Sequence, residues 1–365
     1  MARAPPRSAA VNHDCLKLTI YFGERDRADG GFLADALVRT FARHELATSL
    51  VLRGMEGFGV KHLLRSDRIL TLSEDLPVVS VAVDTRARIE AALADIERLR
   101  FSGLVTLERA RALTAPVSAP PGGDDTSKLT VYVGRQERIG RQAAYEAVVE
   151  LLHRRGIAGA TVLLGVDGTA HGERQRARFI GRNAQVPLMI IAVGDGRALA
   201  AAAEELGTVL ARPLMTFERA RVCKRDGRLL AEPVHAPETD SSGLGLWQKL
   251  MVYAGEQAHH DGQPVYRRLI RELRASGAAG ATALRGIWGY HGDHAPHGDA
   301  FLQLRRRVPV VTVVIDTPER MRKWFAIVDR ITNETGLVTS ELVPAFRATA
   351  GERTRGGLRL AQPGA

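Results

Sequence analysis

One pattern of apolar and polar positions occurs three times along the chain. Each occurrence opens with an apolar segment that a glycine closes, and these segments are KLTIYFGER (17–25), KLTVYVGRQ (128–136) and KLMVYAGEQ (249–257). A G-x-x-G pair follows at one fixed spacing, and the pairs are Gly54 and Gly57, Gly165 and Gly168, and Gly286 and Gly289. A proline then opens an aliphatic run, and each occurrence closes on TLE (106–108), TFE (216–218) or TSE (339–341). So many shared offsets indicate an internal repeat of three copies.

The spacing of apolar residues predicts a helix after the first strand of each copy. In copy 3 an apolar stripe at helical spacing consists of Val265, Leu269, Ile270 and Leu273. Gly156 and Gly277 are placed to end this helix in copies 2 and 3 as left-handed caps, and copy 1 has Glu45 there.

Further segments complete each copy. The second strand is predicted at 49–54, 161–165 and 282–286, and the aliphatic run headed by the proline is the third strand. A second stripe predicts another helix, marked by Ile89, Leu93 and Ile96 in copy 1 and by Met321, Phe325 and Val328 in copy 3. The order β-α-β-β-α-β is that of a ferredoxin-like split βαβ unit, so the predicted fold class is α+β with three tandem ferredoxin-like domains.

Segments rich in proline, glycine and serine separate the copies. The predicted organisation is a disordered N-terminus (1–14), domain 1 (15–113), a linker (114–126), a divergent domain 2 (127–224), a linker (225–246), domain 3 (247–347) and a disordered tail (348–365). Both linkers are expected to be flexible, since their composition favours turns over packed elements.

Composition excludes several classes of protein. The formal net charge is +10, but only six of the 51 basic residues are lysine and the charges are dispersed, so we expect no specific binding to nucleic acid. The longest apolar stretches, such as 186–193 and 308–315, are too short to span a bilayer. Two cysteines, Cys15 and Cys223, imply no disulfide framework, and a reducing cytoplasm is the expected location.

The connection between the second and third strands is long in every copy, and such connections are commonly functional. In copy 3 it contains RGIWGYHGDHAPHGD (285–299), and its possible metal ligands are His291, His294, His297, Asp293 and Asp299. The glycines and the proline of this stretch argue against a rigid metal site, and a hydrated loop whose side chains cap turns is the alternative interpretation.

The paired glycines are the stronger candidate for a binding site. Glycines at the end of a strand can adopt positive φ, let the backbone approach a ligand and form a nest of N–H groups for an anion. Basic residues follow them in each connection, among them Lys61, Arg65, Arg174 and Arg305. The predicted ligand-binding residues are Gly54, Gly57, Phe58, Lys61, His62, Gly286, Trp288, Gly289, Tyr290, His291, Asp293, His294 and Arg305. A tight turn followed by a solvated basic face is the alternative.

Other chemistries find less support. GDGR (194–197) is too short for a phosphate loop and is interpreted as a strand-to-helix turn. Trp288, Tyr290 and Phe58 are interpreted as anchors that pack the root of the long connection. RNA-recognition domains stack bases on aromatic residues of their central strands, but the third strands here are purely aliphatic. The sequence shows no recognisable pairing of nucleophile and base, so we expect a protein that is not an enzyme.

Several stretches resemble the family of domains of unknown function 190, the PII-like proteins of bacteria. They include YFGERDR (21–27), VLRGMEGFGVKHLLRSD (51–67), DLPVV (75–79) and RRRVPVVTVVIDTPER (305–320). Copy 2 departs from the pattern, with Thr169 where the others have Phe58 and Tyr290, and Gly194 where they have Asp84 and Asp316.

The resemblance implies a PII-like fold, which assembles as trimers, holds nucleotides between subunits and presents the long loop to target proteins. The glycine-rich segment with which PII proteins grip nucleotides is not matched here, because the connections 100–103 and 333–336 are short. No cofactor is certain, and a nucleotide or another small anion is the expected ligand.

Three tandem copies lead to two expectations. The chain can fold as its own intrachain pseudo-trimer, because linkers raise the effective concentration of each copy near the others; a homo-oligomer is the alternative. The predicted function is that of a cytosolic regulatory protein which binds a small anionic ligand and signals to a partner protein, for example a membrane transporter or channel. A metal-dependent enzyme using the loop of copy 3 and a structural adaptor are the alternatives.

Overall fold

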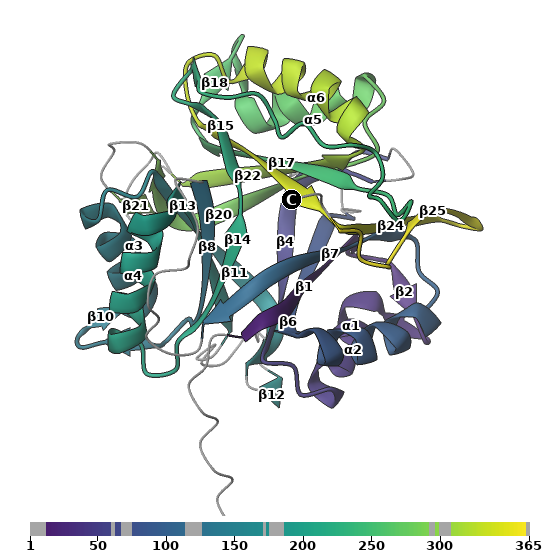
Figure 1. Cartoon of the computed structure of the whole chain (residues 1–365), viewed down its shortest axis with the longest axis horizontal. Helices are drawn as coiled ribbons and strands as arrows, with labels where there is room; N and C mark the ends of the chain where they lie inside the picture. Colours follow the sequence, from purple (N-terminus) through teal and green to yellow (C-terminus); the bar gives the residue numbers. More distant parts are fainter. Residues whose placement is uncertain are drawn as a thin grey trace, which may run out of the picture.

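The computed structural model describes residues 12–59, 63–66, 75–113, 126–170, 173–174, 186–291, 296–298 and 308–362. Within these ranges the protein has mixed α and β structure, with six helices and one extensive antiparallel sheet system. Figure 1 shows three lobes around a common centre, in which paired helices lie on the outside and the long strands face inward.

Copy 1 has the predicted order of elements. Its long strands and helices are β1 (Asn12–Gly23), α1 (Leu33–Arg43), β4 (Thr48–Phe58), β6 (Pro77–Thr85), α2 (Arg86–Arg98) and β7 (Gly103–Leu113). A short hairpin, β2 (Arg27–Ala28) and β3 (Gly31–Phe32), precedes α1, and β5 (Arg65–Ser66) lies in the long connection. The strands pair in the order β4-β6-β1-β7, and every pairing is antiparallel.

Copies 2 and 3 repeat this arrangement. Copy 2 consists of β8 (Thr126–Gly134), α3 (Ala144–Arg154), β11 (Gly159–Ala170), β13 (Pro187–Asp195), α4 (Gly196–Val209) and β14 (Leu214–Arg219). Copy 3 consists of β17 (Trp247–Gly255), α5 (Val265–Ala275), β20 (Ala281–His291), β22 (Pro309–Asp316), α6 (Pro318–Ile331) and β23 (Leu337–Val343). The short strands are β9 (Arg138–Ile139), β10 (Gln142–Ala143), β12 (Glu173–Arg174), β18 (His259–His260), β19 (Gln263–Pro264) and β21 (His297–Gly298).

The predicted ends of the first helices are confirmed. Gly156 and Gly277 have φ of 69° and 85°, and Glu45 adopts the same left-handed conformation with φ of 48°. In copy 1 the N–H of Glu45 donates to the carbonyl of Ala42 at 2.9 Å, and the N–H of Leu46 donates to that of Phe41 at 3.1 Å. This pair of bonds satisfies the last carbonyls of α1, so the chain can turn directly into β4.

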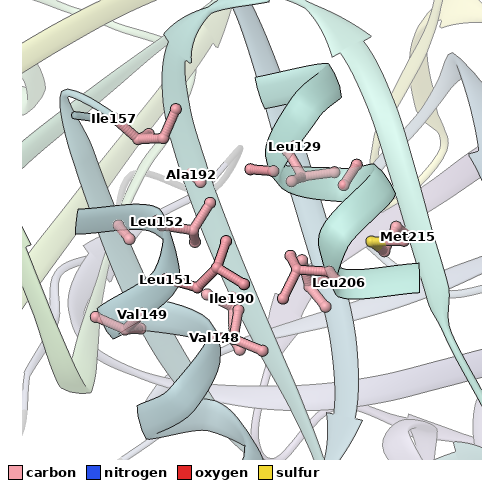
Figure 2. Close-up of a cluster of buried hydrophobic side chains, with 14 of the residues drawn as sticks. Leu129, Val148, Val149, Leu151, Leu152, Ile157, Ile190, Ala192, Leu206 and Met215 are labelled. Carbon is pink, nitrogen blue, oxygen red and sulfur yellow. The ribbon is translucent and has the colours of Figure 1, made fainter. Parts of the chain in front are cut away.

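Each copy has a hydrophobic core between its sheet and its two helices. Figure 2 shows this core in copy 2, where residues of α3 and α4 lie against Leu129, Ile190 and Ala192 of the sheet. The opposite faces of the three sheets meet in a fourth core at the centre, which contains Val79 and Val81 of β6. Both faces of the third strand are therefore buried, which explains why that strand is mostly aliphatic and does not alternate between apolar and polar residues.

Strand pairings between copies close the three units into a ring. The end of β7 pairs with β14, so that Leu113 of copy 1 lies opposite Met215 of copy 2. After β14, β15 (Arg221–Arg225) pairs with β23 of copy 3. After β23, β24 (Ala345–Ala350) pairs with β7 of copy 1. Copy 1 is thus joined to copy 2, copy 2 to copy 3, and copy 3 back to copy 1.

The second linker and the tail differ from the predicted disorder. Residues 348–362 include the end of β24 and β25 (Arg353–Gly357), which pairs with it, and the N–H of Gln362 donates to Asp240 at 2.7 Å. The segment 225–246 contains β16 (Arg228–Leu229) and a turn in which Asp240 accepts from the N–H of Ser242 and of Leu244, each at 2.9 Å. Proline and glycine lower the intrinsic tendency of a segment to form a helix or a strand. Hydrogen bonds to the rest of the structure nevertheless order these two segments.

Candidate functional site

The paired glycines lie inside long strands and not in turns. Gly54 and Gly57 belong to β4, and the equivalent pairs belong to β11 and β20. Of the six glycines only Gly289 has a positive φ, +151°. The prediction of positive φ at these pairs is therefore wrong except at Gly289, and the backbone there pairs with neighbouring strands instead of forming an open nest of N–H groups.

The glycines instead permit three strands to cross. The first half of β4 pairs with β6 of its own copy, and its second half leaves that sheet and pairs with β20 of copy 3. A Cβ at Gly57 would lie 2.7 Å from the carbonyl oxygen of Ala281, and one at Gly168 would lie 2.2 Å from that of Ser49. Only glycine allows so close an approach between strands, and this explains the fixed spacing of the pairs in all three copies.

The aromatic residues after the glycines anchor one copy in the core of the next, whereas the sequence predicted only that they pack the root of the long connection. Phe58 of copy 1 is 3 % exposed and belongs to the hydrophobic core of copy 3. Tyr290 of copy 3 is 2 % exposed and lies in the core of copy 2, with its ring edge-on to His153 at 4.8 Å between centroids. Trp288 packs against the same core.

A cleft lies between copies 1 and 3, where β4 ends. Its volume is about 740 Å³, including the part open to solvent. Its lining is mostly apolar and includes Tyr21, Phe22, Phe58, Leu63, Leu104, Val313 and Ile315, together with the backbone of 279–282. The predicted residue Phe58 therefore borders this cleft, and Gly59 follows it there, whereas Gly54 and Gly57 lie in the strand before it.

One basic side chain stands among the described residues that line this cleft. The guanidinium of Arg65 binds Asp75, with Nε 2.9 Å from Oδ2, and Asp26 lies farther, 3.9 Å from Nη2. Arg65 also lies opposite Gly57 in the pairing of β5 with β4. Because Asp75 stands at the end of the long connection and Arg65 within it, their ion pair joins these two parts of the connection beside the cleft.

Tyr21 also lines the cleft, but its phenol lies close to the carboxylates of Glu108 and Glu341 at the centre of the molecule. Burial raises the pKa of this phenol above the ordinary value, and the carboxylate of Glu108 raises it further. The hydroxyl therefore keeps its proton at neutral pH.

Several predicted site residues cannot be placed in this geometry. Lys61, His62, Asp293, His294, Asp299 and Arg305 lie outside the described residues. The backbone of His291 belongs to β20, and His297 lies in β21 opposite Gly289. The proposed metal ligands of copy 3 therefore remain a prediction.

Six charged residues form a closed ring around the centre of the molecule. Each lysine binds the glutamate of its own copy and that of another: Lys17 binds Glu108 and Glu218, Lys128 binds Glu218 and Glu341, and Lys249 binds Glu341 and Glu108. The distances within a copy are 3.6 Å, 2.7 Å and 2.9 Å. All six residues are at most 7 % exposed.

The ring balances three positive and three negative charges. Burial acts to raise the pKa of Glu218, but Lys128, Lys17 and Lys249 outweigh it and hold that pKa below its ordinary value. Burial acts to lower the pKa of Lys128, but Glu218 and Glu341 outweigh it and raise that pKa well above its ordinary value. The pKa of Lys17 lies below its ordinary value, because burial outweighs Glu108 and Glu218. Its own glutamate is also the most distant of the three.

The three glutamates of the ring do not suit a metal ion. Their carboxylate oxygens lie within 4.8 Å of one another, which is close enough for a shared ion. The three ammonium groups already occupy this position and neutralise the carboxylates, so a cation would have to displace them. Thr216 donates to Oε1 of Glu218 at 3.2 Å, the carboxylate oxygen that does not bind the lysines. Among the residues that the structure describes, the equivalent oxygens of Glu108 and Glu341 have no bonded partner, although each copy has a threonine at that position.

Sequence reasoning missed the role of this ring, although the repeated segments that it used contain all six residues. The lysine of KLT and the glutamate of T-x-E lie opposite each other on paired strands, as Lys17 and Glu108 do. A charge at one position of an otherwise buried strand, repeated in three copies, was the signal that could have revealed it.

Comparison with protein families agrees with the threefold repeat. A family model, DUF190 (Uncharacterized ACR, COG1993), matches residues 15–112, 126–222 and 247–345. Among the described residues, no helix combines the length and apolarity that a membrane crossing requires. With three matches that cover most of its length, the chain belongs to the DUF190 family.

Proposed function

We propose that this protein is a cytoplasmic, PII-like regulatory protein that is not an enzyme. In this proposal a small anionic ligand, such as a nucleotide, binds in the cleft between copies 1 and 3. The strand order β4-β6-β1-β7, which is that of ferredoxin-like units, supports assigning a PII-like fold to each copy. Fold alone does not carry a function, so the argument depends on the cleft.

The single observation that carries the proposal is the position of the Arg65–Asp75 ion pair. Its arginine lines an apolar cleft, and the pair joins the middle of the long connection to its end. An anionic group that binds Arg65 competes with Asp75, while an apolar ring of the same ligand contacts Phe58, Val313 or Ile315.

Competition for Arg65 allows the bound ligand to change the surface that a partner protein recognises. When Arg65 releases Asp75, the direct link between the middle and the end of the long connection is lost, although β5 still pairs with β4 and Asp75 still accepts from the N–H of Arg25 at 2.9 Å. Loss of this link shifts the conformational equilibrium of the connection. A partner protein, for example a membrane transporter or channel, then recognises one state of this connection. The ligand changes the connection only as far as it binds the two states with different affinity.

Calorimetric titration of the full chain with ATP, ADP and inorganic phosphate tests ligand binding. We expect at least one nucleotide to bind, and Arg65→Gln to weaken its binding on the order of tenfold or more, since a charge-assisted hydrogen bond is lost. Ala279→Phe, which places a ring in the cleft, should also weaken it. The matched control is Arg86→Gln, which removes an exposed ion pair on α2 and should leave binding unchanged.

Limited proteolysis tests the effect on the connection. Trypsin cleaves after Lys61 and Arg68, and the nucleotide should change the rate of these cuts in the native chain but not in Arg65→Gln. If none of the three ligands binds, or if Arg65→Gln binds as tightly as the native chain, the proposal is wrong. Zinc binding that is lost in His294→Ala, together with hydrolysis, would favour the metal-dependent enzyme instead.

A further inference from the structure

The crossing strands raise the question of how each copy selects its neighbour. The second half of β4 lies on copy 3, that of β20 lies on copy 2, and that of β11 lies on copy 1. The hydrogen bonds between these strands join backbone groups, which are the same in all three copies. The Lys–Glu ring also repeats the same two residue types at every junction. Neither feature distinguishes one neighbour from another.

Three different units can be placed on a ring of fixed handedness in only two cyclic orders. In the observed order copy 1 crosses onto copy 3, copy 3 onto copy 2, and copy 2 onto copy 1. In the reverse order copy 1 would cross onto copy 2, copy 2 onto copy 3, and copy 3 onto copy 1. Side chains at the crossings differ between the copies and can therefore decide between these arrangements.

At each crossing, one residue of the crossing strand is complementary in size and polarity to the residue opposite it. The aromatic residues Phe58 and Tyr290 lie opposite the small residues Ala281 and Ala160. In copy 2 the equivalent residue is Thr169, and it lies opposite Ser49. An alanine leaves room for a buried ring, whereas a serine supplies a partner for a buried hydroxyl.

The polar junction is bonded through both residues. The hydroxyl groups of Thr169 and Ser49 lie 2.8 Å apart, and the N–H of Thr169 donates to the Ser49 hydroxyl at 3.1 Å. Thr169 and Ser49 are each 0 % exposed. Replacing either partner with a residue that cannot bond would leave a polar group buried and unsatisfied, which is unfavourable.

A partly buried ion pair also distinguishes the junctions. Glu56, 2 % exposed, crosses onto copy 3 with Phe58 and binds Arg267 of α5, with Oε2 3.1 Å from Nε. Arg267 is the third residue of α5, and the third residue of α3 in copy 2 is Glu146. In the reverse order Glu56 would meet Glu146, a second carboxylate in place of a guanidinium.

We infer that these residues fix the cyclic order of the three copies: the Phe58–Ala281, Tyr290–Ala160 and Thr169–Ser49 pairs, supported by Glu56–Arg267. In the reverse order Phe58 would meet Ala160, which it fits, but Tyr290 would meet Ser49 and Thr169 would meet Ala281. Two of the three crossings would then be mismatched. Ser49 would crowd Tyr290 and lose the partner of its hydroxyl, and Thr169 opposite Ala281 would leave an unpaired hydroxyl and a void. The divergence of copy 2 thus has a use, since three identical junctions could not specify an order.

A disulfide reporter distinguishes the two orders in the full chain. An ideal Cβ at Gly280 would lie 3.5 Å from Cα of Gly59, so the pair Gly59→Cys and Gly280→Cys reports copy 1 on copy 3. Gly159 is the residue of copy 2 equivalent to Gly280, so Gly59→Cys with Gly159→Cys reports the reverse order. The native Cys15 and Cys223 are buried and do not compete. After refolding, only the first pair should form a disulfide in the otherwise native chain.

Exchanging the recognition residues then tests the inference. The exchange variant carries Ser49→Ala, Ala281→Ser and Glu146→Arg, which match the crossings named above to the reverse order. Arg267 is kept, because Asp167, the residue of copy 2 equivalent to Glu56, would meet it in that order. We expect the ratio of the 59–280 to the 59–159 disulfide to fall by on the order of tenfold or more after refolding, since each mismatch acts on the equilibrium between orders. An unchanged ratio in a folded exchange variant shows that linkers or other contacts set the order, and overturns the inference.

A second measurement covers an exchange variant that does not fold. Ser49→Ala and Thr169→Val are made singly and together in the native chain, and urea unfolding is followed for each. If these two residues recognise each other, the double variant loses less stability than the sum of the single losses. Strictly additive losses would contradict the inference.

Discussion

The buried ring of lysines and glutamates should dominate the stability of the assembled protein. The perturbation is Glu218→Gln, which nearly preserves side-chain volume and removes one negative charge. Glu218 binds Lys17 of copy 1 and Lys128 of its own copy, so its loss leaves three ammonium groups to share two carboxylates. Removing one partner of a buried ion pair destabilises a protein by about 3–5 kcal/mol, and we expect a loss in this range.

Urea unfolding followed by tryptophan fluorescence measures this loss in the full chain. Glu97→Gln is the matched control, because Glu97 also pairs with a residue of another copy, Arg347, but its side chain is 47 % exposed. That exposed pair should contribute less than about 1 kcal/mol. If Glu218→Gln is no more destabilising than Glu97→Gln, the reasoning about the ring is refuted.

A compensating variant separates lost attraction from uncompensated charge. Lys128→Met with Glu218→Leu removes one charge of each sign and leaves two lysines and two glutamates in the ring. Replacing a whole buried pair by apolar residues is often close to neutral, so this double variant should be more stable than Glu218→Gln. If the double variant loses as much unfolding free energy as Lys128→Met and Glu218→Leu lose singly when summed, the ring acts through specific contacts and not through charge balance.

The effect of Glu218→Gln should depend on pH. The lysines hold the pKa of Glu218 and of Glu108 below the ordinary value of 4.5, against the opposing effect of burial. A depressed carboxyl pKa contributes stability that is present above the ordinary pKa and lost as pH falls below it. The difference in unfolding free energy between the native chain and Glu218→Gln should therefore shrink as pH is lowered from about 7 to about 3. A difference that stays constant with pH would contradict this.

Three further outcomes follow from the packing. Phe58→Ala should reduce the free energy of unfolding by about 3–5 kcal/mol, because it leaves a void in the core of copy 3; Phe32→Ala, at a residue 46 % exposed, should have little effect in the same urea titration. Gly168→Ala places a Cβ 2.2 Å from the carbonyl of Ser49 and should markedly lower the melting temperature, whereas Gly31→Ala, whose Cβ meets open space, should not. Burial raises the pKa of Cys223 to about 12, so a thiol reagent at pH 8 should label it only after unfolding, and fast labelling of native protein would show that this site is accessible.

Local sequence patterns predicted the elements because their causes are local. The apolar stripe from Val265 to Leu273 determines which face of α5 is buried, and Gly156, Gly277 and Glu45 end the first helices as expected. The three closing segments and the proline-headed strands were also located correctly. The predicted binding residues could be placed only in part, since a cleft formed by two copies depends on contacts far apart in the chain.

The sequence by itself determined that one unit of two helices and four main strands is repeated three times, since periodicity and caps depend on neighbouring residues. Only the tertiary structure decided that the paired glycines serve as crossing points, that the segments after Arg225 and Arg347 are ordered, and that Lys17, Lys128 and Lys249 meet three glutamates at the centre. Each of these features arises where strands of different copies meet. The physical reason is that the apolar pattern of a strand indicates how much of it is buried, but not which distant strand packs against it or pairs with it.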